Sequence, residues 1–208
     1  MQDYLQLTPV ASIIFIFTIV TSIFAFYNAD TYGKFMLHPY SVAKGKNIYQ
    51  LITSGMVHKD WSHLIFNMLS YFFFAFQLEQ TIGHWQFALL YIVSLILSDL
   101  PTVIKHKDDF WYNSLGASGA VCAILFSYIL FSPLDKLIIF PIPFPIPAVV
   151  FGVLYLIYSS YAARKSNDGI NHDAHFYGAV TGILITFILY PQVIQIFLSK
   201  LSGGYSFF

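Results

Sequence analysis

Long runs of apolar residues, separated by shorter polar segments, occupy most of the chain. A membrane-spanning helix needs about 20 mostly apolar residues, and shorter ones are tolerated down to roughly 17. Six runs approach this length, and charged residues or prolines end several of them, such as Glu79, Pro133 and the pair Arg164-Lys165. The pattern predicts an all-α integral membrane protein, a bundle of six transmembrane helices. The predicted spans are 9–29, 62–79, 83–104, 115–132, 147–163 and 172–197.

The connections between these runs differ in length and character. The first, 30–61, is long, carries four lysines and is rich in aromatic residues. We expect it to lie at the membrane interface beside the bundle. The fourth has proline at every second position from Pro141 to Pro147, a spacing that forbids helix and favours an extended segment. No repeat or domain boundary interrupts the pattern, so residues 1–208 are predicted to form one domain.

The composition agrees with a membrane protein and excludes several other classes. Of the 208 residues, 57% are hydrophobic and 10% are charged, whereas a soluble domain carries roughly 25% charged residues. The formal net charge of +0 and the lack of a basic run argue against a nucleic-acid partner. The single cysteine, Cys122, excludes an internal disulfide and a cysteine-based zinc site. We expect the lipid bilayer as partner, and neither a cleaved signal peptide nor an appended soluble domain.

Six spans would bring the reactive side chains to one end of the bundle. The first, third and fifth connections then lie on the same side of the membrane. His58 and His63 follow the first connection, Ser118 follows the third, and His172 and His175 follow the fifth. Ser118 and His175 would also lie at similar depth, each close to the start of its helix.

Ser118 and His175 are the candidates for a nucleophile and its base. Serine is a poor nucleophile unless a base takes its proton. Gly178 and Gly182 form a small-residue face of the kind that lets transmembrane helices approach closely. If that face packs against Gly116, Gly119 and the alanines after them, the hydroxyl and the imidazole can come within about 3 Å. A packing role for the small residues and a structural hydrogen bond for His175 remain the alternatives.

His63 and Asn67 are candidates for stabilising a developing negative charge. Their spacing of four residues places them on one face of a helix, and both side chains can donate hydrogen bonds. The backbone N–H of Ser118, in the first turn of its helix, would be a third donor. Acyl transfer needs such donors for the oxyanion. The same two side chains could also form a polar clamp between helices, which is compatible with the first role.

Together these motifs resemble the rhomboid family of intramembrane serine proteases, over about residues 45–185. Each motif is weak alone, but their order, their spans and their shared side make the likeness specific. The residues that carry it are His63-xxx-Asn67, Gly116-x-Ser118-Gly119, Ala174-His175-xx-Gly178-xxx-Gly182, the segment from Leu51 to His58, and Glu79.

The resemblance implies a rhomboid-like core and an activity. It implies a Ser118–His175 dyad without an acidic third member, and an oxyanion hole made by Asn67, His63 and the Ser118 backbone. It further implies a first loop half-embedded in the membrane, water reaching the site, transmembrane proteins as substrates and no cofactor. A bare six-span core fits a bacterial inner membrane, with the active site opening to the non-cytoplasmic side. The sequence gives no indication of the oligomeric state.

Two positions depart from the family pattern. The family often has Trp-Arg just before the Leu-Ile-Thr segment, where this chain has Tyr49-Gln50. Some members have a tyrosine one turn after the nucleophile, packed on the catalytic histidine, where this chain has Cys122. The sequence therefore leaves open what anchors the first loop and what orients the ring of His175.

Other classes of function are weaker interpretations. A catalytically inactive relative that binds membrane proteins would usually lack the serine or the histidine. A metalloprotease or metal transporter could use His58, His63, His172, His175 and Asp173, but the spacing HExxH is absent. A channel or carrier would need charged residues inside the spans, and such residues are nearly missing from the six runs. Asp173 lies two residues from His175 on a different helix face, so we expect a helix-start carboxylate there.

The distribution of lysine and arginine conflicts with the implied orientation. Eight of these residues lie in the odd-numbered loops and only two, Lys136 and Lys200, on the other side. The positive-inside rule would then place the active end in the cytoplasm. We follow the resemblance and expect that end outside the cytoplasm.

Overall fold

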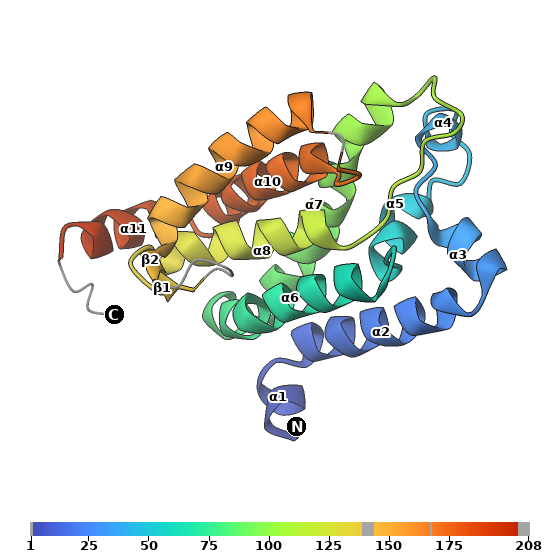
Figure 1. Cartoon of the computed structure of the whole chain (residues 1–208). Coiled ribbons are helices and arrows are strands. Elements are labelled where there is room, and N and C mark those ends of the chain that lie inside the picture. Colours follow the sequence, from blue (N-terminus) through green and yellow to red (C-terminus); the bar gives the residue numbers. More distant parts are fainter. Residues whose placement is uncertain (1, 139–143, 167, 204–208) are drawn as a thin grey trace.

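The protein is described here by a computed structural model that covers residues 2–138, 144–166 and 168–203. These residues are mostly helical, and Figure 1 shows the long helices packed side by side. The helices are α1 (Gln2–Leu7), α2 (Pro9–Phe26), α3 (Ala29–Phe35), α4 (Pro39–Val42), α5 (Gln50–Thr53), η1 (Ser54–Met56), α6 (Trp61–Ile82), α7 (His84–Lys105), α8 (Ser118–Phe131), α9 (Ala148–Lys165), α10 (His172–Leu189) and α11 (Val193–Leu201). Two short strands, β1 (Lys136–Leu137) and β2 (Ile146–Pro147), pair antiparallel.

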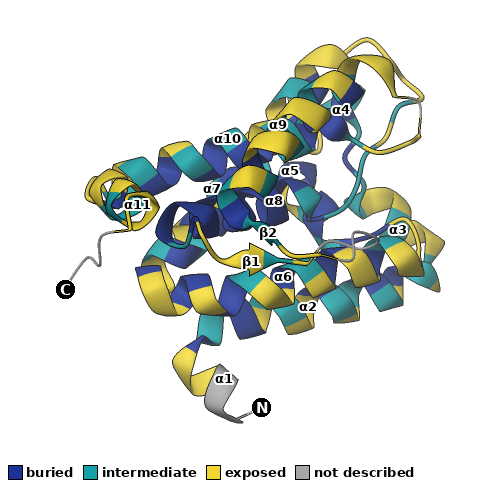
Figure 2. Ribbon diagram, turned by 60° about the vertical axis from the view of Figure 1, so that its left-hand side comes forward, coloured by how far each residue is buried: buried dark blue, intermediate teal, exposed yellow. Residues whose placement is uncertain are grey.

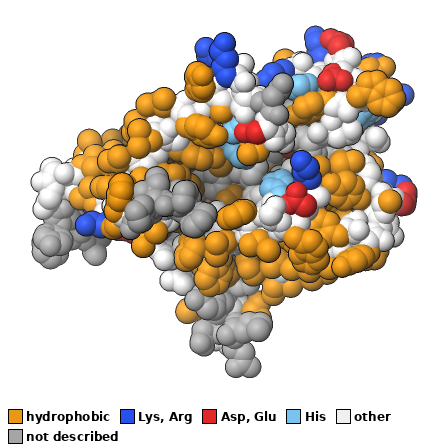
Figure 3. All heavy atoms as spheres, in the orientation of Figure 1, with side chains coloured by type: hydrophobic (Ala, Val, Ile, Leu, Met, Phe, Trp, Pro, Cys, Tyr) orange, Lys and Arg blue, Asp and Glu red, His pale blue; other side chains and the backbone are white. Residues whose placement is uncertain are grey.

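Helix α8 is the centre of the bundle. Every residue of α8 after Ser118 is buried, and α10, α6 and α7 pack around it. The outer helices α2 and α9 instead expose much of their surface, as Figure 2 shows. Their exposed side chains are large and apolar, among them Phe17, Phe24, Leu154 and Ile157, and apolar side chains cover most of the face in Figure 3. Such a surface suits lipid rather than water.

The number of membrane spans stays a prediction. Six long helices, α2 and α6 to α10, occupy the six predicted runs. Among the described residues, only α2 and α7 are both long enough and apolar enough to cross a membrane by themselves. The pair α10 and α11 would add a third span if counted as one, and α8 is apolar but has only 14 residues.

The predicted sixth span, 172–197, is not one continuous helix. Helix α10 stops at Leu189, and α11 continues at an angle of 110° to it. Pro191 explains the break, because proline disfavours helical backbone in the residue before it. Tyr190 accordingly adopts φ −136° and ψ 73°. The fourth run is also shorter than predicted, since α8 begins at Ser118 rather than at 115.

The first connection is folded against the bundle. It contains α3, α4, α5 and η1, and Leu37 pairs with Ser114 of the third connection through two backbone hydrogen bonds of 2.9 and 3.0 Å. Gln50 is buried, accepts a hydrogen bond from the His38 N–H and donates one to the Lys34 carbonyl. Gln50 therefore anchors the first connection, for which the sequence alone did not identify an anchoring residue.

The proline-rich fourth connection contains two short strands and a bend at Phe144 where the structure describes it. The strands, β1 and β2, pair Lys136 with Pro147 and Leu137 with Ile146. Pro141 and Pro143 lie outside the described residues. At the same end of the bundle, the buried carboxylate of Glu79 accepts the backbone N–H groups of Val10 and Ala11 at the start of α2. This contact ties α6 to α2 through otherwise unpaired first-turn donors.

Candidate active site

Ser118 is the first residue of α8. The chain enters this helix through Gly116, whose φ of +115° is a conformation that glycine adopts without strain. The Gly116 N–H donates to the Ser54 carbonyl at 2.9 Å, which holds the entry segment against the first connection. The backbone ladder of α8 begins when the Val121 N–H bonds to the Ala117 carbonyl. The N–H of Ser118 thus belongs to the first-turn donors that a helix leaves without a partner of its own.

Helices α8 and α10 touch through their backbones. A Cβ placed on Gly178 would collide with the Gly119 carbonyl, and one on Gly182 would collide with the Ala123 carbonyl. The predicted small-residue face is therefore the contact surface of α10. One turn further along, the Thr186 hydroxyl donates to the Ser127 hydroxyl at 2.7 Å across the same pair of helices.

This crossing brings the starts of the two helices together. A Cβ on Gly119 would lie 3.3 Å from the Ala174 carbonyl oxygen, so the neighbours Ser118 and His175 belong to the same junction. Both side chains are partly buried. Among the described residues, no hydrogen bond joins the Ser118 hydroxyl to the His175 imidazole. In free enzymes such bonds are often long and tighten only when substrate binds.

His63 of α6 lies directly against the entry to α8. A Cβ on Gly116 would be 2.8 Å from its Nε2 and 2.6 Å from its Cε1. Gly116 therefore packs on α6, whereas the sequence predicted it on the side facing α10. The His63 Nδ1 accepts a hydrogen bond from the Lys59 N–H at 3.4 Å, which leaves Nε2 as the donor in the neutral ring. That donor points to the segment that leads into Ser118.

Asn67 lies one turn further along α6 and is buried. Its side-chain amide donates to the His63 carbonyl at 3.0 Å, so the two candidate oxyanion donors share one helical face as predicted. Asp60 caps this helix by accepting the His63 N–H at 2.8 Å. Its hydrogen bonds, first from the Ser62 hydroxyl and then from the His63 N–H, lower the pKa of Asp60.

The start of α10 is fixed by a network of polar side chains. The Asn171 side-chain oxygen Oδ1 accepts the Ala174 N–H, and the side-chain amide donates to the hydroxyls of Thr102 and Ser114. Asp173 forms an ion pair of 2.6 Å with Lys105 of α7. Asp173 lies in the first turn of α10, as predicted, and it is not bonded to His175; its ion pair with another helix was not predicted.

Two histidine pairs lie at this end of the bundle. The rings of His58 and His63 meet edge to face at 5.0 Å between centroids, and those of His172 and His175 at 5.9 Å. His172 is bonded to Asp168 at 3.1 Å. Hydrogen bonds from the Ile170 N–H, then from Ser166 and His172, hold the pKa of Asp168 well below its usual range. Within the described ranges, no three His, Cys, Asp or Glu side chains converge as metal ligands would.

His58 is the most deeply buried of these histidines. It is fully shielded from solvent, and its Nδ1 is 2.9 Å from the Ser22 hydroxyl of α2. Its Nε2 has no hydrogen-bond partner among the described atoms. Burial, with a smaller effect of His63, lowers the pKa of His58 to about 3, so the ring is neutral at physiological pH. Its contacts join α2 to the loop before α6, which fits a structural role.

Tyr155 of α9 is a site residue that the sequence analysis missed. Its ring stacks on His175 with centroids 6.5 Å apart and planes 27° from parallel. Its hydroxyl is 3.2 Å from the Cys122 sulfur. The signal available in the sequence was the small residue at position 122, which leaves room for a ring from elsewhere. That ring comes from α9, and the apolar pattern of this helix does not indicate that Tyr155 contacts His175.

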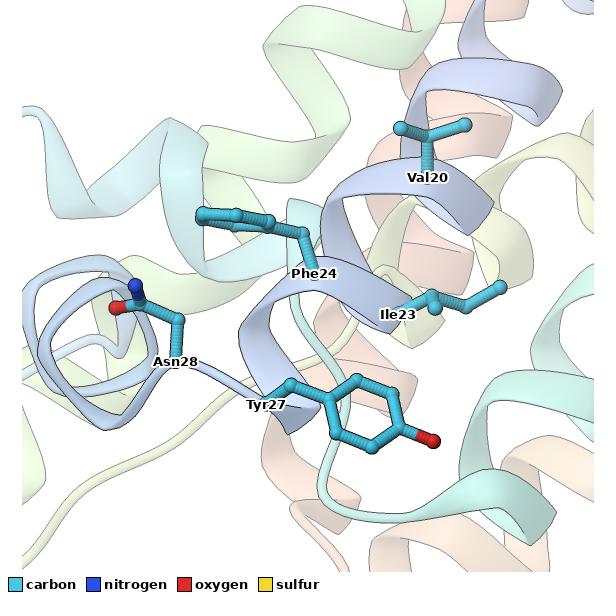
Figure 4. A pocket seen from close by; sticks show the side chains of 5 residues that line it. All are labelled: Val20, Ile23, Phe24, Tyr27 and Asn28. Carbon is cyan, nitrogen blue, oxygen red and sulfur yellow. The ribbon is translucent and has the colours of Figure 1, made fainter.

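One hollow in the surface lies away from this junction. It has a volume of about 450 Å³ and lies at the end of α2, lined by Val20, Ile23, Phe24, Tyr27 and Asn28 (Figure 4). None of these side chains is a candidate for chemistry, and most belong to the outer apolar face. In Figure 3, histidine side chains instead border a hollowed part of the face near the middle of the molecule.

Comparison with known proteins points to one family. Residues 45–192 match the rhomboid domain. The chain is 29% identical to the "Putative rhomboid protease YdcA" of Bacillus subtilis (strain 168), over 90% of this chain and 92% of the relative. It is 28% identical to the "Rhomboid protease AarA" of Providencia stuartii, over 73% of this chain and 63% of the relative. "Rhomboid protein 1, mitochondrial" of Saccharomyces cerevisiae (strain ATCC 204508 / S288c) is 29% identical, over 64% of this chain and 40% of the relative.

The helical bundle, its apolar outer surface and the polar junction at the starts of α8 and α10 define an integral membrane protein. With the domain match extending over most of its length, the chain belongs to the rhomboid family.

Proposed function

We propose that the protein is an intramembrane serine endopeptidase that cleaves transmembrane segments of other membrane proteins. The observation that carries the proposal is the backbone contact between Gly119 and Gly178. Ser118 directly precedes Gly119 and His175 lies one turn before Gly178, so the contact supports a pairing of this serine with this histidine. Family membership supports the same class of reaction.

The chemical steps use three sets of groups. The Ser118 hydroxyl oxygen attacks a substrate carbonyl carbon while His175 takes its proton. The oxyanion that forms accepts hydrogen bonds from the Ser118 N–H, the His63 Nε2–H and the Asn67 amide. His175 then gives the proton to the leaving amine as the peptide C–N bond breaks. Water hydrolyses the remaining ester with His175 as base, which regenerates the serine.

The substrate must present an unpaired carbonyl to this site. In a membrane helix every backbone amide is already hydrogen-bonded, so a scissile segment has to unwind locally. We therefore expect preferred segments to contain small or helix-destabilising residues. We also propose that all six long helices cross a bacterial inner membrane, with the site on the non-cytoplasmic side.

The test is cleavage of a single-span model protein by the purified chain in detergent. Wild type, Ser118→Ala, His175→Ala and the remote control Ser199→Ala are compared, each with and without a chelator. We expect cleavage by wild type and Ser199→Ala, loss in both dyad variants, and no effect of the chelator. Cleavage by Ser118→Ala would overturn the proposal. Failure of wild type both to cleave and to react with a fluorophosphonate probe would indicate an inactive relative.

A further inference from the structure

The orientation of His175 depends on ring contacts rather than on a carboxylate. Among the described residues, no hydrogen bond to its imidazole is found, and the nearby acids have other partners, Lys105 for Asp173 and His172 for Asp168. A general base nevertheless has to hold one ring nitrogen toward its proton donor. The groups that restrain this ring are therefore those that cover its faces and edges.

Tyr155 covers one face of that ring. The two rings lie nearly parallel, at a centroid distance within the range of offset-stacked aromatic pairs. The other ring neighbour, His172, meets His175 edge to face at 83°. A stacked neighbour resists rotation of the imidazole about its χ2 bond, because the turning ring would strike the tyrosine face. His172 lies on the same helix as His175, whereas Tyr155 restrains the ring from a different helix, α9.

Tyr155 is itself held from three directions. Its hydroxyl meets the sulfur of Cys122, which is buried one turn after Ser118 in α8. The rings of Phe126 and Phe151 pack on it with centroids 5.9 and 5.4 Å away. The stack thus connects α8, α9 and α10, and it links the helix of the nucleophile to the ring of the base.

We propose that Tyr155 is the positioning residue for His175, with Cys122 fixing the tyrosine from the helix that carries Ser118. The inference rests on the proposed Ser118–His175 function. Its consequence is that α9 takes part in catalysis by holding the base in the orientation needed for proton transfer. Displacing a catalytic group by about 1 Å can reduce a rate by roughly a hundredfold.

The experiment uses the purified full chain in detergent with a fluorescent single-span substrate. Tyr155→Leu removes the stacked ring, and Tyr155→Phe keeps the ring but loses the contact with Cys122. Tyr161→Leu, at an exposed tyrosine of the same helix, controls for changes in α9 itself. For each variant, kcat, KM, their pH profiles and the rate of fluorophosphonate labelling of Ser118 are measured.

We expect Tyr155→Leu to lower kcat and the labelling rate about tenfold to a hundredfold, with KM changed by less than about twofold. Its kcat profile should also shift along the pH axis, which a purely structural loss of active molecules would not produce. Tyr155→Phe keeps the stacked ring but loses the contact with Cys122, so it should lower kcat measurably but less than Tyr155→Leu does, and Tyr161→Leu should behave as wild type. Wild-type kcat and an unshifted profile in Tyr155→Leu would overturn the inference while leaving the proposed function intact. If wild type neither cleaves nor labels, the proposed function fails, and the positioning role fails with it.

Discussion

At the scale of single residues, the amide of Asn67 is the most direct test of the proposed oxyanion hole. One of its hydrogens is donated to the His63 carbonyl in the free protein, and the other is available to a substrate. We expect Asn67→Ala to lower kcat by about 10²–10³-fold with little change in KM, because such a donor acts mainly on the transition state. Steady-state kinetics would measure this loss of kcat. Asn113→Ala, a change at an exposed position of the third connection, is the control. An unchanged kcat in Asn67→Ala would remove it from the site.

His58 makes the stability of the fold depend on pH. Its pKa is about 3 in the folded protein and 6.5 in the unfolded reference, so the unfolded state binds the proton first as pH falls. The His58 ring therefore does not make the free energy of unfolding depend on pH above about pH 6.5. Between about pH 6.5 and pH 3 the folded state loses stability as the pH falls. The loss at pH 5 should be about 2 kcal/mol. The midpoint temperature of thermal unfolding in detergent should fall less on acidification in His58→Gln than in wild type. Equal decreases of that temperature with pH in the two proteins would contradict this.

Residue types and spacing predicted which side chains gather at one end of the bundle. The spacing of four between His63 and Asn67, and the glycines at 178 and 182, gave contacts that the structure contains. Tyr155 and Gln50 could not be found in this way. Both act through partners far away in the sequence, Tyr155 on His175 and Gln50 on His38 and Lys34. The Ser118–His175 dyad itself stays a prediction.

At the scale of helices, the crossing of α8 and α10 depends on two residues without side chains. A methyl group on Gly178 would meet backbone atoms of Gly119, which cannot move aside as a side chain can. We expect Gly178→Ala to destabilise the protein by roughly 1–3 kcal/mol through overpacking and to lower activity by separating the helix starts. Thermal unfolding and cleavage by the same sample would measure both effects.

Gly152→Ala in α9 is the matched control for this prediction. The nearest atom to an added methyl is the Ile129 Cδ1 at 3.1 Å, the far end of a flexible side chain. The neighbour can shift by a few tenths of an ångström, so we expect a much smaller loss. Equal losses in Gly178→Ala and Gly152→Ala would mean that the effect reflects helical glycine in general rather than this crossing.

Apolar periodicity located the helices well but not every boundary. The six runs correspond to α2 and α6 to α10, because a continuous apolar stretch has to satisfy its backbone within one helix. The prediction failed at Pro191, where apolar residues continue past a proline that bends the chain by 110°. It also gave no helices for the first connection, whose short elements are held by contacts such as Leu37 with Ser114 rather than by their own pattern.

At the scale of the whole molecule, charge and proposed chemistry disagree about orientation. The eight lysines and arginines of the odd-numbered loops all lie at the proposed active end. Several are engaged in the folded protein, Lys34 with Asp30, Lys105 with Asp173, and Lys44 over the ring of Tyr40 at 3.4 Å. The positive-inside rule nevertheless counts such residues whether or not they are paired. The orientation therefore has to come from a measurement on the intact chain in its membrane.

Reporter fusions give a direct prediction for that orientation. An alkaline phosphatase fused after Asp108, in the third connection, should be active in a bacterial host because the enzyme folds only outside the cytoplasm. A fusion after Gly203 should be inactive, since six spans return the chain to its starting side. Replacing Lys44 and Lys46 by glutamine should raise the fraction in this orientation, because lysines in a translocated loop oppose its transfer. Inactive fusions at 108 with active ones at 203 would place the site in the cytoplasm, and the bilayer would then present substrates to Ser118 from its inner face.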